Sequence, residues 1–360
     1  MKYQVLEMVG ISGEFPVNQL HRLIESSSYA EKIITELKNE KLIRTHYRDR
    51  LRGYRLTKHA KELLLAQNMP RFHDYLTGNT ETNLIRSELP RRIRLHQKAE
   101  IYLTLLHANI PIFYDVKPNI FNRTCEADSS FIQDLPLFYS SREIKTLGYD
   151  TTKIRNSRSV GILLSPQCVY ALYNTGNSVL KWEYKTEVRL TAFLQHYLQG
   201  RPYHGRPAVR AIMTGKDMDT AYHLLTSTGG YRKSLFLLDT TYEHFHYLPN
   251  NIYGEYLLRL LVRPQQLDRL LLSDYFSHQE ELPIEHDGID SQNHPVLLAY
   301  DFDMQRINRF NTGLNVYDLS GILVCFDFQI PCLRKYLTAD IQFSSIDFQK
   351  FKRGFFHEKP

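Results

Sequence analysis
The stretch KLIRTHYRDRLRGYRLTKHAKELL, from Lys41 to Leu64, predicts a β-hairpin followed by a helix. Its first part alternates between apolar and polar side chains as two strands do, with a turn expected at residues 50–53. Thr57 then offers an N-cap to a segment with helical apolar spacing. Positive charge is concentrated here, because residues 44–61 hold seven Lys or Arg and one acidic residue.

Three segments before the hairpin have apolar residues at helical spacing, residues 3–9, 16–25 and 28–42. The serines at 26–28 separate the second segment from the third and offer N-caps to the third. The second and third segments form a helix-turn-helix candidate. The order of three helices, a hairpin and a helix predicts a winged helix over residues 1–67.

The order and spacing over residues 1–67 resemble the winged helix-turn-helix domains of bacterial transcriptional and plasmid proteins, with residues 41–64 as the matching signature. The resemblance implies that the third helix enters the major groove of DNA and that the hairpin tip approaches the backbone or the minor groove. The DNA contacts predicted on this basis are Ser27, Ser28, Tyr29, Lys32, Arg48, Arg50, Arg52, Tyr54 and Arg55. The alternative is a solvated hairpin in an adaptor that binds other proteins.

Composition sets the wider bounds. A chain of 360 residues that is 42% hydrophobic is long enough for two or three domains. A net charge of +6 is moderate, so an anionic partner has to be argued from where the charge lies. No apolar run approaches the ~18 residues of a membrane helix, and the N-terminus lacks a signal-peptide core. The four cysteines form no CxxC pair, so neither a zinc site nor a disulfide framework is predicted. The expected location is the cytoplasm, with no membrane partner.

The rest of the chain is expected to contain a linker with a basic amphipathic helix, residues 68–109, and a mixed-sheet α/β domain, residues 110–360. The basic end of that helix gives three possible further DNA contacts, Arg91, Arg92 and Arg94, or is only the solvated end of a packing helix. The larger domain is expected to begin with a three-stranded antiparallel meander over residues 159–184 and to continue with alternating strands and helices. The predicted fold class is therefore α+β or α/β.

Three further segments suggest a family: FYSSREIKTLG (138–148), SRSVGILL (157–164) and VYALYNTGNSVLKWEYKTEVR (169–189). Together with the N-terminal winged helix, they make the chain similar to the replication-relaxation-type proteins of plasmids and integrative conjugative elements of Gram-positive bacteria. The resemblance implies binding of double-stranded DNA during replication, relaxation or transfer of a mobile element, with relaxase or replication proteins as partners. It supplies no catalytic residues.

An enzymatic alternative comes from the expected meander, which resembles the core of PD-(D/E)xK nucleases. The two Glu-x-Lys triplets provide weak catalytic candidates, Glu143 with Lys145 and Glu183 with Lys185. In such a site two carboxylates hold Mg²⁺ and the lysine stabilises charge on the phosphate. Residues 168–174 contain no aspartate, and Asp134 precedes the meander, so a degenerate core without catalysis is favoured. No metal or cofactor is predicted unless this alternative holds.

Two other interpretations stay open. His244-Phe245-His246 resembles the His-hydrophobic-His metal motif of rolling-circle initiators and relaxases, with Tyr253 and Tyr256 as possible nucleophiles, although no third ligand is evident. The second domain can also be that of a transcriptional regulator that senses a ligand. The sequence does not decide the oligomeric state.

Overall fold

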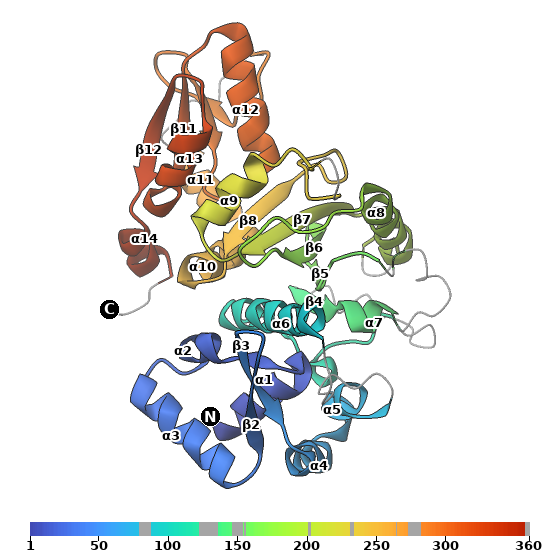
Figure 1. Ribbon diagram of the computed structural model, residues 1–360. Helices are drawn as coiled ribbons and strands as arrows, with labels where there is room; N and C mark the ends of the chain where they lie inside the picture. Colours follow the sequence, from blue (N-terminus) through green and yellow to red (C-terminus); the bar gives the residue numbers. More distant parts are fainter. Residues whose placement is uncertain are drawn as a thin grey trace. The chain divides into compact units, whose positions relative to one another are not determined.

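The computed structural model of this chain describes residues 1–78, 88–121, 136–145, 154, 156–200, 203–230, 234–263, 265–272 and 282–356. The chain divides into two compact units, residues 1–143 and 144–360. Helices and mixed sheets occur in the chain as expected, which confirms the combination of α and β structure (Figure 1). No helix among the described residues is long and apolar enough to cross a membrane.

The first unit consists of a small antiparallel sheet and the helices that pack around it. In chain order its elements are α1 (Lys2–Ser12), β1 (Phe15–Pro16), η1 (Val17–Gln19), α2 (Leu20–Leu23), α3 (Ser27–Asn39), β2 (Ile43–Arg48), β3 (Leu51–Leu56), α4 (Lys58–Gln67), α5 (Met69–Leu76), α6 (Leu89–His107), η3 (Tyr114–Val116) and β4 (Leu137–Ser140), and α7 (Ser141–Lys145) follows at the boundary. The sheet order is β1-β3-β2. The two-residue strand β1 was not expected from the sequence.

The first unit extends past the expected boundary at residue 67. Every residue of α1 from Val5 to Ser12 is buried, so this helix needs neighbours on all sides. Helices α4, α5 and α6 supply them, because each packs against α1. The segment expected to be a linker therefore contributes two helices to the core of the first unit.

The hairpin turns earlier than the sequence suggested. Arg48 pairs with Leu51 in the register of β2 and β3, so Asp49 and Arg50 make the two-residue turn. Both have positive φ, 54° and 61°, as the tight turns favoured in hairpins require. Gly53 lies within β3 instead of in the turn. A glycine is needed at this position because a Cβ atom would lie 2.5 Å from Cγ of Glu14.

Glu14 is a fully buried carboxylate that holds the hairpin and α6 together. Arg55 of β3 donates to its Oε2 from Nε at 2.8 Å and from Nη2 at 2.6 Å. Arg92 of α6 donates from Nη2 to its Oε1 at 2.6 Å, and His96 donates from Nε2 to the same oxygen at 2.9 Å. Burial raises the pKa of Glu14, but the hydrogen bonds from His96, Arg92 and Arg55 outweigh that effect and hold the pKa well below its usual value.

Arg92 also fixes the backbone of the hairpin tip. Its Nη1 donates to the carbonyl oxygen of Arg48 at 2.8 Å, and its Nη2 donates to that of Leu51 at 3.0 Å. These two carbonyls flank the turn. One guanidinium therefore links the buried carboxylate to the strand ends on both sides of the turn.

The second unit contains two sheets joined by helices. Its elements are β5 (Gly161–Leu164), β6 (Cys168–Asn174), α8 (Tyr184–Leu198), β7 (Ala208–Gly215), α9 (Met218–Leu225), β8 (Phe245–Pro249), α10 (Ile252–Leu261), α11 (Gln265–Leu272), β9 (Gly288–Ile289), β10 (Pro295–Leu298), α12 (Met304–Tyr317), β11 (Gly321–Phe326), η6 (Asp327–Gln329), α13 (Ile330–Tyr336), β12 (Ile341–Ile346) and α14 (Phe348–Phe355). In one sheet β5, β6, β7 and β8 are neighbours in that order, and the other sheet has the order β12-β11-β10-β9. Parallel neighbours are connected through helices, as parallel pairing demands.

The expected three-stranded meander is wrong in its third strand. β5 and β6 pair antiparallel, but the next neighbour of β6 is β7, which runs parallel to it. Residues 178–184 form only an isolated bridge, from Lys181 to Leu235, before α8 begins. Within this segment the ring of Trp182 is buried against Tyr173 and Phe236, and its Nε1 donates to Asp239. These contacts are compatible with a path outside the sheet.

The buried carboxylate gives a stability prediction. Glu14→Gln leaves two guanidinium groups buried without a counter-charge, so we expect the free energy of unfolding to fall by about 3–5 kcal/mol. The pKa of Glu14 is lower in the folded than in the unfolded chain, so its contribution is complete above pH 4.5 and is lost as the pH falls below that value. Thermal unfolding of both proteins across this range checks the prediction.

The matched control is Glu62→Gln, which removes an exposed carboxylate whose lysine partner is 3.8 Å away. We expect this variant to unfold like the wild type at every pH. Equal stability of Glu14→Gln and Glu62→Gln at pH 7 would contradict the role given to Glu14.

Candidate nucleic-acid interface
The start of α3 presents an exposed polar surface. Ser26 caps the helix, because its Oγ accepts a hydrogen bond from the Tyr29 amide at 3.4 Å. All four side chains predicted here are exposed, Ser27, Ser28, Tyr29 and Lys32. The opposite side of α3 is buried through Ala30, Ile33, Ile34 and Leu37. The amphipathic pattern thus orients the predicted contact residues toward solvent.

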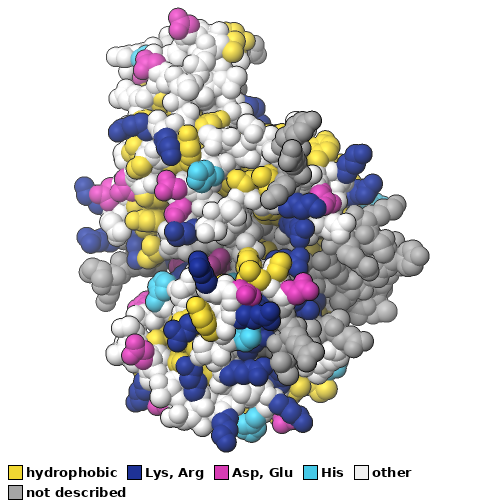
Figure 2. All heavy atoms as spheres, in the orientation of Figure 1, with side chains coloured by type: hydrophobic (Ala, Val, Ile, Leu, Met, Phe, Trp, Pro, Cys, Tyr) yellow, Lys and Arg dark blue, Asp and Glu magenta, His cyan; other side chains and the backbone are white. Residues whose placement is uncertain are grey.

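The hairpin tip presents exposed guanidinium groups. Arg48, Arg50 and Arg52 are exposed, as are Arg44 and Tyr47, which were not among the predicted contacts. Arg48 lies 3.4 Å from the carboxylate of Asp49, but both side chains are open to solvent and such pairs are weak. Figure 2 shows Lys and Arg side chains over the first unit on the face in view, with Asp and Glu among them.

The strand register divides these side chains between the two faces of the hairpin. Tyr47 and Arg52 are direct cross-strand partners, so they share one face. Further along that face Tyr54 packs toward α3, with Nζ of Lys38 5.6 Å from its ring centre. Arg48 lies on the other face, because side chains alternate along a strand. The face with Tyr47 and Arg52 is therefore the one that borders α3.

Three predicted DNA contacts are corrected by their burial. Tyr54 is 5% exposed, Arg55 is 1% exposed and Arg92 is fully buried. Both arginines donate to Glu14, so their guanidinium groups are engaged inside the protein. A side chain in this position cannot reach a phosphate unless the first unit opens. Arg91 and Arg94, on either side of Arg92 in α6, are exposed.

Glu143, one nuclease candidate, is engaged within the first unit. Its carboxylate lies 2.9 Å from Nζ of Lys117 and accepts a hydrogen bond from the Ser140 amide at 2.7 Å. The Lys117 side chain is 1% exposed, and its burial lowers its pKa. This pair is an internal ion pair at the start of α7. Lys145 lies at the end of the same helix.

Glu183, the other candidate, precedes α8 and is not at the end of a strand. It lies 3.0 Å from Nζ of the exposed Lys181, and that pairing lowers its pKa. Lys185 is exposed on the first turn of α8. Asp134 lies outside the described residues. Each glutamate thus already has a lysine partner.

The two histidines of the His-Phe-His motif lie side by side, with ring centres 6.1 Å apart. Each has an aspartate at Nδ1, Asp303 at 2.5 Å from His244 and Asp301 at 3.3 Å from His246. Among the described residues, no group of three His, Cys, Asp or Glu is arranged to hold a metal ion.

The tyrosines proposed as nucleophiles lie in an aromatic cluster. Tyr253 stacks on Phe328, with ring centres 4.1 Å apart, and contacts the edge of Phe348. Tyr256 is buried and also packs on Phe348. These contacts give both tyrosines a packing role.

No protein-family model, curated protein or solved structure matches this chain. The resemblance to replication-relaxation-type proteins stays a prediction from the sequence.

Replacing Glu143 and replacing Glu183 are expected to change the free energy of unfolding by different amounts. Glu143→Gln leaves Lys117 buried without its counter-charge, so we expect the free energy of unfolding to fall by about 3–5 kcal/mol. Glu183→Gln removes a partner of an exposed lysine and is expected to change it by less than about 0.5 kcal/mol. Chemical denaturation of both variants checks this, and equal effects would contradict the structural role assigned to Glu143.

Proposed function
We propose that residues 1–67 form a winged helix that binds double-stranded DNA. The observation that supports it best is a set of exposed arginines at the tip of a hairpin whose backbone is held by hydrogen bonds from the buried Arg92. The exposed first turns of α3 provide the second contact surface.

The charge at the tip favours a phosphate backbone as the partner. Arg50 and Arg52 are exposed, and no ion pair within the described residues engages either of them. Each arginine that neutralises a phosphate releases condensed counterions, which makes binding favourable and dependent on salt. Since Arg92 fixes the turn from within, little backbone entropy is lost when the tip docks.

The start of α3 suits the recognition of bases. Tyr29 and Lys32 extend from consecutive turns on the exposed side of the helix. In a winged helix this element enters the major groove, where base edges differ in their donors and acceptors. We assign sequence preference to α3 and salt-dependent affinity to the hairpin.

The resemblance of the sequence is what supports a proposal for the biological role. We propose an accessory factor in the replication or conjugative transfer of a mobile element, with relaxase or replication proteins as partners. Metal-dependent nicking is not favoured, because Glu143 is engaged in a buried ion pair with Lys117 and Glu183 is not at the end of a strand.

The hairpin is tested by replacing Arg48, Arg50 and Arg52 together with Ala. We expect duplex affinity to fall, because these side chains can no longer neutralise phosphates. The slope of log K against log salt should flatten by about 0.9 for each phosphate that the variant leaves unneutralised. Titration of a labelled duplex at several salt concentrations measures both, with duplex selected from a random pool.

The control carries the same change of net charge elsewhere. Arg189, Arg206 and Arg269 are exposed in the second unit, and replacing them with Ala also removes three positive charges. We expect this variant to keep the wild-type slope. If both triple variants bind duplex with the same reduced affinity, or both bind like the wild type, the hairpin is not the DNA-binding element.

A further inference from the structure

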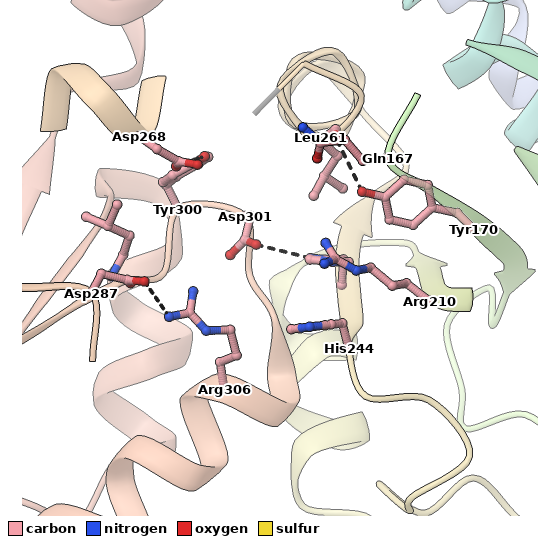
Figure 3. Close-up of a pocket in the computed structure, with 12 residues that line it drawn as sticks. Gln167, Tyr170, Arg210, His244, Leu261, Asp268, Asp287, Tyr300, Asp301 and Arg306 are labelled. Carbon is pink, nitrogen blue, oxygen red and sulfur yellow. Dashed lines mark hydrogen bonds and ion pairs between the residues drawn. The ribbon is translucent and has the colours of Figure 1, made fainter. Parts of the chain in front are cut away.

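The second unit contains a cavity of about 310 Å³ that no part of the DNA-binding proposal uses. Strands β6, β7 and β8 line one side, and residues beside β9 and β10 together with α11 and α12 line the other (Figure 3). The lining residues that matter for its chemistry are Tyr170, Arg210, His246, Asp268, Asp301 and Arg306. The volume is at the lower end of the range for small-molecule sites.

The frame of the cavity is held by contacts between the two sheets. The Tyr247 amide of β8 donates to the carbonyl of Phe302 at 3.0 Å, and His246 forms a β-bridge with Asp303. Asp303 also caps α12, and its Oδ2 forms a hydrogen bond with Nδ1 of His244 at 2.5 Å. The side chains at this junction are therefore preorganised.

Most polar groups of the lining are already satisfied. Arg306 donates to Glu285 at 2.8 Å and to Asp287 at 2.6 Å. Asp268 accepts from the Tyr300 hydroxyl at 2.5 Å. Figure 3 shows Asp268 and Tyr300 directed at one another, and Arg306 directed at Asp287. These contacts satisfy the hydrogen-bonding groups of Arg306, Asp268 and Tyr300 within the protein.

Two cationic or potentially cationic groups, Arg210 and His246, each keep a buried nitrogen that has no acceptor among the described residues. Arg210 reaches into the cavity from β7, and within the described part of the chain its guanidinium makes no hydrogen bond or ion pair; its Nε is buried without a partner. His246 is 2% exposed, and neither ring nitrogen makes a hydrogen bond to the described residues, although Nδ1 lies 3.3 Å from Oδ2 of Asp301. Buried donors without acceptors are unfavourable and are rare in folded proteins.

We propose that the cavity binds a small ligand through an oxyanion, a phosphate or a carboxylate, that accepts hydrogen bonds from Arg210 and His246. Guanidinium groups are matched to both oxyanions in shape and charge. Asp301 lies beside the same place, paired with His246 and with the Asp303 amide, and its negative charge disfavours a bare anion there. We therefore expect a ligand that carries a hydroxyl or amino donor next to its oxyanion. An anion alone would be repelled by Asp301.

The titration of His246 agrees with this assignment. Burial lowers its pKa, but Asp301 and Asp303 outweigh the burial and raise it above its usual value. The raised pKa favours the protonated ring, in which both nitrogens donate. Nε2 of the protonated ring is then a donor without an acceptor among the described residues, and a ligand oxygen can accept its hydrogen bond.

Calorimetric titration of the full-length chain tests the proposal with three probes: inorganic phosphate, ribose 5-phosphate and glycine. We expect ribose 5-phosphate or glycine to bind more tightly than inorganic phosphate, and Arg210→Gln to weaken that binding at least tenfold. Arg189→Gln, an exposed arginine outside the lining, is the control and should bind like the wild type. The better probe decides between phosphate and carboxylate. Binding that is absent for all three, or equal in Arg210→Gln and the control, overturns the proposal.

Thermal unfolding without ligand separates a binding role from a structural one. Arg210→Met keeps an unbranched side chain as far as the position of Nε and removes the unmatched buried donor, so we expect an unchanged or raised melting temperature. A lower melting temperature of Arg210→Met, or unfolding of Arg210→Gln, would show that the fold itself uses Arg210 and would overturn the proposal.

Discussion
One buried carboxylate, Glu14, organises the first unit. It receives Arg55 from the hairpin and both Arg92 and His96 from α6, elements far apart in the sequence. An unpaired charge in this place would be strongly destabilising, so the three donors and the carboxylate depend on one another. Because Arg92 continues to the carbonyls on either side of the turn, the position of the hairpin tip follows from the same cluster. The exposed arginines of the tip therefore extend from a hairpin backbone that is fixed by the buried cluster.

The sequence predicts the local structure of this unit well and its long-range pairing poorly. Helical spacing and the polar serines locate α3, and alternation locates the hairpin, because these signals are local. The burial of Arg55 and Arg92 depends on Glu14, which is 41 residues from the first and 78 residues from the second. The hydrophobic periodicity of the sequence does not reveal a contact over that distance. Gly53 was interpreted as a turn residue, whereas its real reason is the space that Glu14 needs. Treating every arginine of a basic stretch as exposed was the error.

The second unit shows the same limit. Alternating strands and helices were expected after the meander and are present, as β7, α9, β8 and α10 show. Residues 178–184 look like a strand, but they form only an isolated bridge, and the ring of Trp182 is buried against Phe236. The His-Phe-His motif suggested a metal site, whereas the structure leads us to propose an oxyanion site beside its second histidine. Its second histidine faces a cavity with Arg210, a residue that no motif singles out.

The measurement that tests the account most directly is amide hydrogen exchange of the full-length chain, with and without saturating duplex. We expect duplex to slow exchange at residues 27–32 and 47–52 and to leave the interior of α6 unchanged, since the cluster around Glu14 is already closed in the free protein. Protection confined to other segments, or faster exchange in α6 on binding, would contradict a DNA surface displayed on a fixed hairpin.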